Sequence, residues 1–114
     1  MDRVEFTHLV FLLMNYANRI GLNIAGDWWL RDQETQKRLY AEKKSRTLNS
    51  RHGVGKAIDF IIFDDQRPRQ PQWKHNGYKL LGEYWKSLNE DCVWGGDWLD
   101  ADGNPWDPYH FEVK

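Results

Sequence analysis

A single acidic residue in the most apolar segment of the chain places the strongest constraint on its fold. Residues 57–63 read Ala-Ile-Asp-Phe-Ile-Ile-Phe, and their β-branched and aromatic side chains predict a buried strand. An unpaired carboxylate in such a strand would be strongly destabilising. We therefore expect the fold to bring a cation close to Asp59.

The remaining hydrophobic pattern predicts helices and short strands in an irregular order. Helices are expected over residues 4–19, 32–44 and 77–89, and further extended segments over 22–30, 93–94 and 110–113. Leu39 and Tyr40 are the expected inward residues of the second helix. Polar stretches at 45–56 and 64–72 are expected to form loops. Because helices and strands do not alternate regularly, an α+β fold with a small antiparallel sheet flanked by helices fits better than a parallel α/β fold.

Composition limits the organisation and the partners of the chain. Its 114 residues suit one domain, and 40% hydrophobic with 29% charged residues is typical of a folded protein. A net charge of −1 gives no electrostatic reason to expect a nucleic-acid or anionic-membrane partner. The single Cys92 can form neither an internal disulfide nor a thiolate zinc cluster. The N-terminus lacks the features of a signal peptide, and the longest apolar run, residues 9–14, is too short to insert into a membrane.

The first chemically informative segment joins a histidine to the acidic strand residue. His52 and Asp59 are seven positions apart, so on one uninterrupted strand they would face opposite sides. Gly53 and Gly55 lie between them, and glycine permits a turn that brings both side chains to one point.

The second informative segment is Asp107-Pro108-Tyr109-His110-Phe111-Glu112. If it is extended, Phe111 faces the core while His110 and Glu112 share the opposite face. Together with His52 and Asp59 of the first segment, His110 makes three candidate metal ligands. Three ligands of N and O type, with a fourth position left for water, are typical of catalytic zinc. Asp107, close to His110, is then a candidate general base. A simpler interpretation stays open, in which the histidines are hydrogen-bonded and Asp59 forms a salt bridge.

Four ordered motifs resemble one family. The run Ser50-x-His52-x-x-Gly55-x-Ala57-x-Asp59 is similar to the signature of the zinc D-alanyl-D-alanine carboxypeptidase and L-alanyl-D-glutamate endopeptidase family (VanY-like), which shares its fold with the Hedgehog signalling domain. The other three matches are Trp94-Gly95-Gly96-Asp97-Trp98, Asp107-x-x-His110-Phe111-Glu112, and Arg31 followed by Gln36 and Leu39-Tyr40.

The resemblance implies a role for each matching position. His52, Asp59 and His110 match the zinc ligands, and Asp107 matches the general base. Arg31 matches a position where some members hold an Arg that steadies the substrate or the oxyanion, although Asp32 replaces the usual Thr or Ser beside it. A longer stretch, residues 99–106, separates the Gly-Gly motif from Asp107 and is expected at the rim of the cleft.

The resemblance also implies a function. The chain is expected to be one zinc peptidase domain, residues 1–114, without a separate cell-wall-binding domain. Its predicted activity is hydrolysis of the L-Ala–D-Glu bond of peptidoglycan stem peptides, as in phage endolysins with Asp at the base position. The alternatives are a D,D-carboxypeptidase that removes terminal D-Ala and a non-hydrolytic zinc-containing binding module. A phage enzyme of this kind is expected to be monomeric, to be made in the host bacterial cytoplasm, and to act on the cell wall after release by a holin.

Several further residues receive predictions of their own. Trp85 and Trp94 are expected in the core because their neighbours are apolar, and Trp106 is expected to form a wall of the cleft. Glu112 fits two interpretations, a residue that holds a ligand histidine or a solvated strand residue. Tyr109 is expected to pack beside the site rather than to contact a reacting group.

Overall fold

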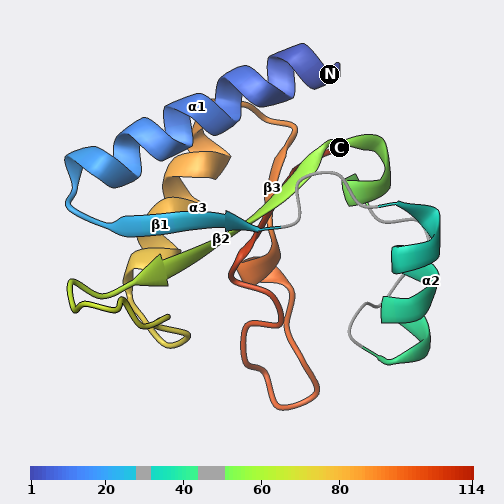
Figure 1. Cartoon of the computed structure of the whole chain (residues 1–114). Helices are drawn as coiled ribbons and strands as arrows, with labels where there is room; N and C mark the ends of the chain where they lie inside the picture. Colours follow the sequence, from blue (N-terminus) through green and yellow to red (C-terminus); the bar gives the residue numbers. More distant parts are fainter. Residues whose placement is uncertain (28–31, 44–50) are drawn as a thin grey trace.

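The computed structural model describes residues 1–27, 32–43 and 51–114. These form three α-helices, four strands and two short 3₁₀ helices (Figure 1). In chain order they are α1 (Arg3–Arg19), β1 (Asn23–Asp27), α2 (Gln33–Ala41), η1 (Arg51–Val54), β2 (Ala57–Phe63), α3 (Gly77–Leu88), β3 (Cys92–Trp94), η2 (Gly95–Asp97) and β4 (His110–Val113). Within the described residues, no helix is long and apolar enough to cross a membrane.

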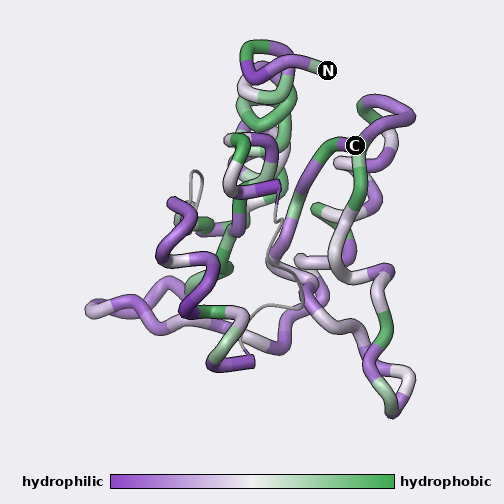
Figure 2. Tube along the Cα trace, turned by 90° about the vertical axis from the view of Figure 1, so that its right-hand side faces the viewer, coloured by the Kyte–Doolittle hydropathy of each residue, from purple (hydrophilic) through white to green (hydrophobic). Residues whose placement is uncertain are grey.

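Helix α1 begins and ends where its sequence dictates. Asp2 and Glu5 form a reciprocal capping box, in which each side chain accepts a hydrogen bond from the other residue's backbone N–H. The helix ends before Gly21, whose φ of 80° lies in the left-handed region that glycine adopts readily. Hydrophobic and hydrophilic residues are mixed along its length, as in an amphipathic helix (Figure 2).

The strands form one antiparallel sheet in the order β1-β2-β4-β3. Strand β2 is central and pairs with β1 on one side and with β4 on the other. In the β2–β4 pair, Asp59 lies directly opposite His110. The predicted α+β class with a small antiparallel sheet is confirmed.

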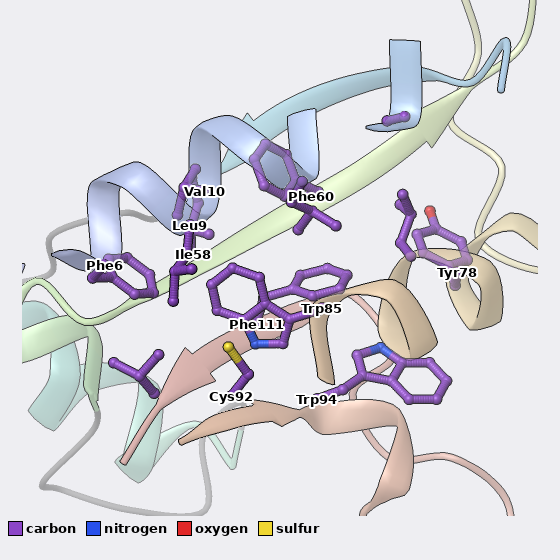
Figure 3. Close-up of a cluster of buried hydrophobic side chains, with 14 of the residues drawn as sticks. Phe6, Leu9, Val10, Ile58, Phe60, Tyr78, Trp85, Cys92, Trp94 and Phe111 are labelled. Atoms are coloured by element: carbon purple, nitrogen blue, oxygen red, sulfur yellow. The ribbon is translucent and has the colours of Figure 1, made fainter. Parts of the chain in front are cut away.

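The two faces of the sheet have different environments. One face packs against α1 and α3 and forms the hydrophobic core (Figure 3), whose strand residues include Ile58, Phe60 and Phe111. Trp85 and Trp94 belong to this core, as predicted. Because side chains alternate along a strand, the residues between these positions point to the opposite face. The candidate site lies on that opposite face.

Helix α2 lies apart from the sheet (Figure 1). The side chain of Asp32 caps its N-terminus by accepting a hydrogen bond from the backbone N–H of Thr35. Leu39 is buried, as predicted, but Tyr40 is 47% exposed, so the prediction that it faces inward is wrong. With only nine residues and a narrow contact surface, α2 buries one stripe of side chains, which consists of Gln36 and Leu39.

Candidate metal centre and active site

Three side chains from three different elements converge on the face of the sheet opposite the hydrophobic core. His52 comes from η1, Asp59 from β2 and His110 from β4. The His52 Nε2 and His110 Nδ1 atoms are 3.2 Å apart, and Asp59 Oδ1 lies 3.2 Å from His110 Nδ1 and 3.4 Å from His52 Nε2. We call these three residues the ligand triangle.

The local backbone explains how His52 reaches Asp59. Residues 51–54 form one 3₁₀ turn, and Gly55 follows with φ of 69°, in the left-handed region. The N–H of Lys56 then donates to the carbonyl of Arg51, which closes the turn before β2 begins. The predicted turn between His52 and Asp59 is therefore present. Of the two glycines in this segment, Gly55 is the one whose backbone conformation favours glycine.

The ligand triangle has the dimensions and donors of a zinc site. Zinc bonds of about 2.0–2.1 Å in tetrahedral geometry separate neighbouring ligand atoms by about 3.3–3.4 Å. The three observed separations, 3.2, 3.2 and 3.4 Å, match that spacing. Two imidazole nitrogens with one carboxylate oxygen are a donor set that catalytic zinc sites use. His52 and His110 are only 2% and 6% exposed, and each directs one ring nitrogen toward the other, Nε2 of His52 and Nδ1 of His110.

Glu112 orients His110 from behind. Its carboxylate lies 2.7 Å from Nε2 of His110, so that nitrogen donates its proton to Glu112 and leaves Nδ1 to face the ligand triangle. Such a carboxylate–histidine pair fixes the ring and its tautomer in metal sites. The sequence leaves two interpretations of Glu112 open. The structure supports the one in which Glu112 holds His110 in place rather than being a solvated strand residue.

Electrostatics in the ligand triangle favour a charged pair. Burial works to raise the pKa of Asp59, but hydrogen bonds with His110 and His52 outweigh burial and lower this pKa below its ordinary value. Burial likewise works to lower the pKa of His110, but hydrogen bonds with Asp59 and Glu112 prevail and raise this pKa to about 9. A protonated His110 would therefore offer Asp59 the cation that the sequence predicts beside it, and a metal ion would compete with that proton.

Asp107 borders the ligand triangle. Its Oδ2 atom is 3.9 Å from His110 Nδ1, and its side chain is about one third exposed at 32%. The backbone N–H of Asp107 donates to the carbonyl of Gly95, and its own carbonyl accepts from the N–H of His110. A Cβ atom on Gly95 would overlap the Asp107 carbonyl, so the absence of a side chain at Gly95 lets the two segments pack closely.

One aromatic side chain packs directly against the ligand triangle. The ring of Trp98 lies 5.2 Å from that of His110. The hydroxyl of Tyr109 donates to the carbonyl of Trp73, and the two rings pack edge to face, which agrees with the expected packing role of Tyr109. Trp106 is 39% exposed. The sequence does not predict the contact of Trp98 with His110, although the position of Trp98 in the Trp-Gly-Gly-Asp-Trp motif is an available signal.

Residues 99–105 form a hairpin between Trp98 and Trp106. Leu99 pairs with Pro105, and the carboxylate of Asp100 accepts hydrogen bonds from the N–H groups of Asp102 and Asn104. The N–H of Trp106 donates to the carbonyl of Trp98 at 2.6 Å, which closes the base of the hairpin. Two residues singled out in the sequence, Arg31 and Ser50, lie outside the described residues, so the catalytic role expected of Arg31 stays a prediction.

Comparison with known proteins identifies the family. The family model described as D-alanyl-D-alanine carboxypeptidase, of the M15 peptidases, matches residues 43–113, which is more than half of the chain and contains the whole ligand triangle. The chain therefore belongs to this peptidase family.

The fold agrees with this assignment. The crystal structure of the Serratia marcescens L-Ala D-Glu endopeptidase ChiX superposes with a TM-score of 0.72 at 20% sequence identity, over 96% of this chain and 78% of that chain. At that identity the likeness shows a shared fold. No curated protein matches the chain in sequence.

Proposed function

We propose that the protein is a zinc-dependent peptidoglycan peptidase that cuts the L-Ala–D-Glu bond of stem peptides. The observation that carries this proposal is the ligand triangle, with the spacing of tetrahedral zinc ligands and the carboxylate of Asp107 at its edge. His52, Asp59 and His110 would hold the metal. When bound, zinc would lower the pKa of a water molecule to about 7 and would act as a Lewis acid toward the scissile carbonyl.

The residues around the metal position have separate roles in this proposal. Asp107 accepts a proton from the attacking water and delivers it to the departing amine, as a general base and then a general acid. Glu112 keeps Nδ1 of His110 directed into the ligand triangle. Because water is the nucleophile, no covalent intermediate with the protein forms.

The choice of bond separates two candidate activities. The shared fold with an L-Ala D-Glu endopeptidase supports the endopeptidase, whereas the description of the matching family model favours a D,D-carboxypeptidase as the second candidate. Asp107 supports hydrolysis in either case, since a module that only binds peptidoglycan has no need of a carboxylate beside the metal.

Mass spectrometry of digested peptidoglycan tests the proposal and separates its alternatives. The zinc-loaded protein would be incubated with purified sacculi, beside a sample with chelator. New fragments that begin at D-Glu, absent with chelator, are the expected result. Loss of terminal D-Ala alone would establish the carboxypeptidase instead. If protein that holds zinc released neither product, hydrolysis would be rejected in favour of a binding module.

The biological setting is proposed on the family resemblance alone. It comprises a single monomeric catalytic domain, a phage or prophage origin, and release to the cell wall through a holin.

A further inference from the structure

Trp94 makes a polar contact that its place in the core does not require. The ring is buried at the edge of the hydrophobic cluster (Figure 3), yet its Nε1–H group donates to the carbonyl of Pro108 at 2.8 Å. Pro108 immediately follows Asp107 and lies two residues before His110. The side chain of Trp94 therefore holds the backbone between the proposed general base and a proposed metal ligand.

Two glycines restrict the indole of Trp94 to one position. A Cβ atom on Gly82 of α3 or on Gly96 of η2 would overlap the indole ring. The ring thus lies in a slot formed by the backbone at Gly82 and Gly96, and this close packing disfavours a change of rotamer. A flat ring fixed in this way holds its N–H group in a constant direction.

A salt bridge reinforces the slot. Lys86 of α3 lies over the Trp94 ring, with Nζ 5.7 Å from the ring centre, and pairs with Asp97 of η2 at 2.8 Å. The elements that carry Gly82 and Gly96 are thereby tied together across the edge of the indole. Helix α3, which packs into the hydrophobic core, and η2 together set the direction of the Nε1–H group.

We propose that Trp94 is a positioning residue for Asp107. Its hydrogen bond to Pro108 fixes the 107–110 segment, so that the Asp107 carboxylate stays at the edge of the ligand triangle. The inference rests on the proposed function, because it assigns Trp94 to the same reaction. Catalysis depends steeply on such placement, since a shift of about 1 Å can cost about a hundred-fold in rate.

Replacement of the indole N–H tests this role. In Trp94→Phe the hydrogen bond is lost, and incorporation of β-(3-benzothienyl)alanine at position 94 removes the N–H while it keeps a bicyclic ring of the same shape. Both variants are expected to bind one zinc per chain and to keep the KM of the wild type, while kcat on stem peptides falls about ten- to a hundred-fold.

Tyr78→Phe is the matched control. Tyr78 is also a buried aromatic residue whose side chain bonds the backbone, but its hydroxyl donates to the carbonyl of Gln72 and accepts from the N–H of Ile62, neither of which lies in the 107–110 segment. We expect Tyr78→Phe to lower the thermal midpoint at least as much as Trp94→Phe and to keep kcat within about two-fold of the wild type. Equal losses of kcat in the two variants would reduce Trp94 to a structural residue and overturn the inference.

A second readout does not depend on activity. The indole N–H resonance of Trp94, assigned by its disappearance in Trp94→Phe, is expected to exchange with solvent much more slowly than that of the exposed Trp73. Rapid exchange would overturn the inference, as would a benzothienylalanine variant with the kcat of the wild type. A wild-type protein without any metal-dependent activity would overturn the proposed function instead, and with it the positioning role of Trp94 in that reaction.

Discussion

At the scale of single residues, Asp107 and His110 lie in the same short segment, but replacing them is expected to affect different properties, turnover in one case and metal binding in the other. Asp107→Ala keeps the ligand triangle, so it should bind zinc normally while turnover falls about a hundred- to ten-thousand-fold, the contribution typical of a general base. His110→Ala removes a ligand and should lose the metal itself. Metal content by mass spectrometry, beside rates of stem-peptide cleavage, distinguishes the two. Near wild-type turnover in Asp107→Ala would remove Asp107 from the mechanism.

Glu112 should act on the metal through His110. Glu112→Gln removes the negative charge behind the imidazole while it keeps a side chain of the same shape, so zinc affinity should fall about ten- to a hundred-fold. Competition with a chromogenic chelator measures this affinity. Glu83→Gln, on the exposed surface of α3, is the control and should bind zinc like the wild type. Unchanged affinity in Glu112→Gln would show that its contact with His110 does not tune the site.

The thiol of Cys92 gives a prediction of pH dependence. Burial raises the pKa of Cys92 to about 11, above an ordinary value near 9. Since the folded protein holds the proton more tightly than the unfolded chain, the thiol contributes stability that is complete below about pH 9 and is lost as the pH rises toward 11. The gap in free energy of unfolding between the wild type and Cys92→Ala, measured in urea, should therefore shrink over that range. If the difference in free energy of unfolding stayed constant between pH 9 and 11, the raised pKa of Cys92 would be contradicted.

At the scale of elements, helix propensity and packing have opposite effects on stability at Gly82 of α3. Alanine is the better helix former by about 1 kcal/mol, so Gly82→Ala would stabilise an isolated helix. In the folded protein the new methyl group meets the indole of Trp94, and we expect a net loss of about 1–3 kcal/mol in urea unfolding. Lys79→Ala, exposed on the same helix, should change stability by less than about 0.5 kcal/mol. A Gly82→Ala protein as stable as the wild type would show that the slot can widen.

Elements with a strong local pattern were predictable from sequence, and those defined by distant contacts were not. The apolar run at 57–63 predicted β2, and the alternation after Pro108 predicted β4 with Phe111 toward the core. Their register, which sets Asp59 opposite His110, depends on pairing across 51 positions, and periodicity carries no information about it. The contact of Trp98 with His110 also joins two separate segments, so periodicity does not predict it. Tyr40 is predicted to face inward because the pattern of a short helix does not show how many of its side chains the rest of the protein covers.

At the scale of the whole molecule, a metal in the ligand triangle would link η1, β2 and β4. Binding to the folded state alone adds stability, by about 2.7 kcal/mol when free zinc is a hundred times its dissociation constant. The thermal midpoint should therefore rise with zinc and fall with chelator. His110→Ala should show neither change. Identical midpoints of the wild type with zinc and with chelator would contradict a metal site built into the fold.

The hairpin at residues 99–105 has a consequence for how proteins of this shape can diverge. The N–H groups of Asp100, Asp102, Gly103 and Asn104 all bond acceptors within the hairpin. The bond between Trp98 and Trp106 closes the hairpin before the chain reaches Asp107. We therefore expect the tip to gain, lose or exchange residues without a change in the arrangement of the ligand triangle. Insertions that lengthen a protein of this shape would be tolerated at this tip more readily than within the paired strands.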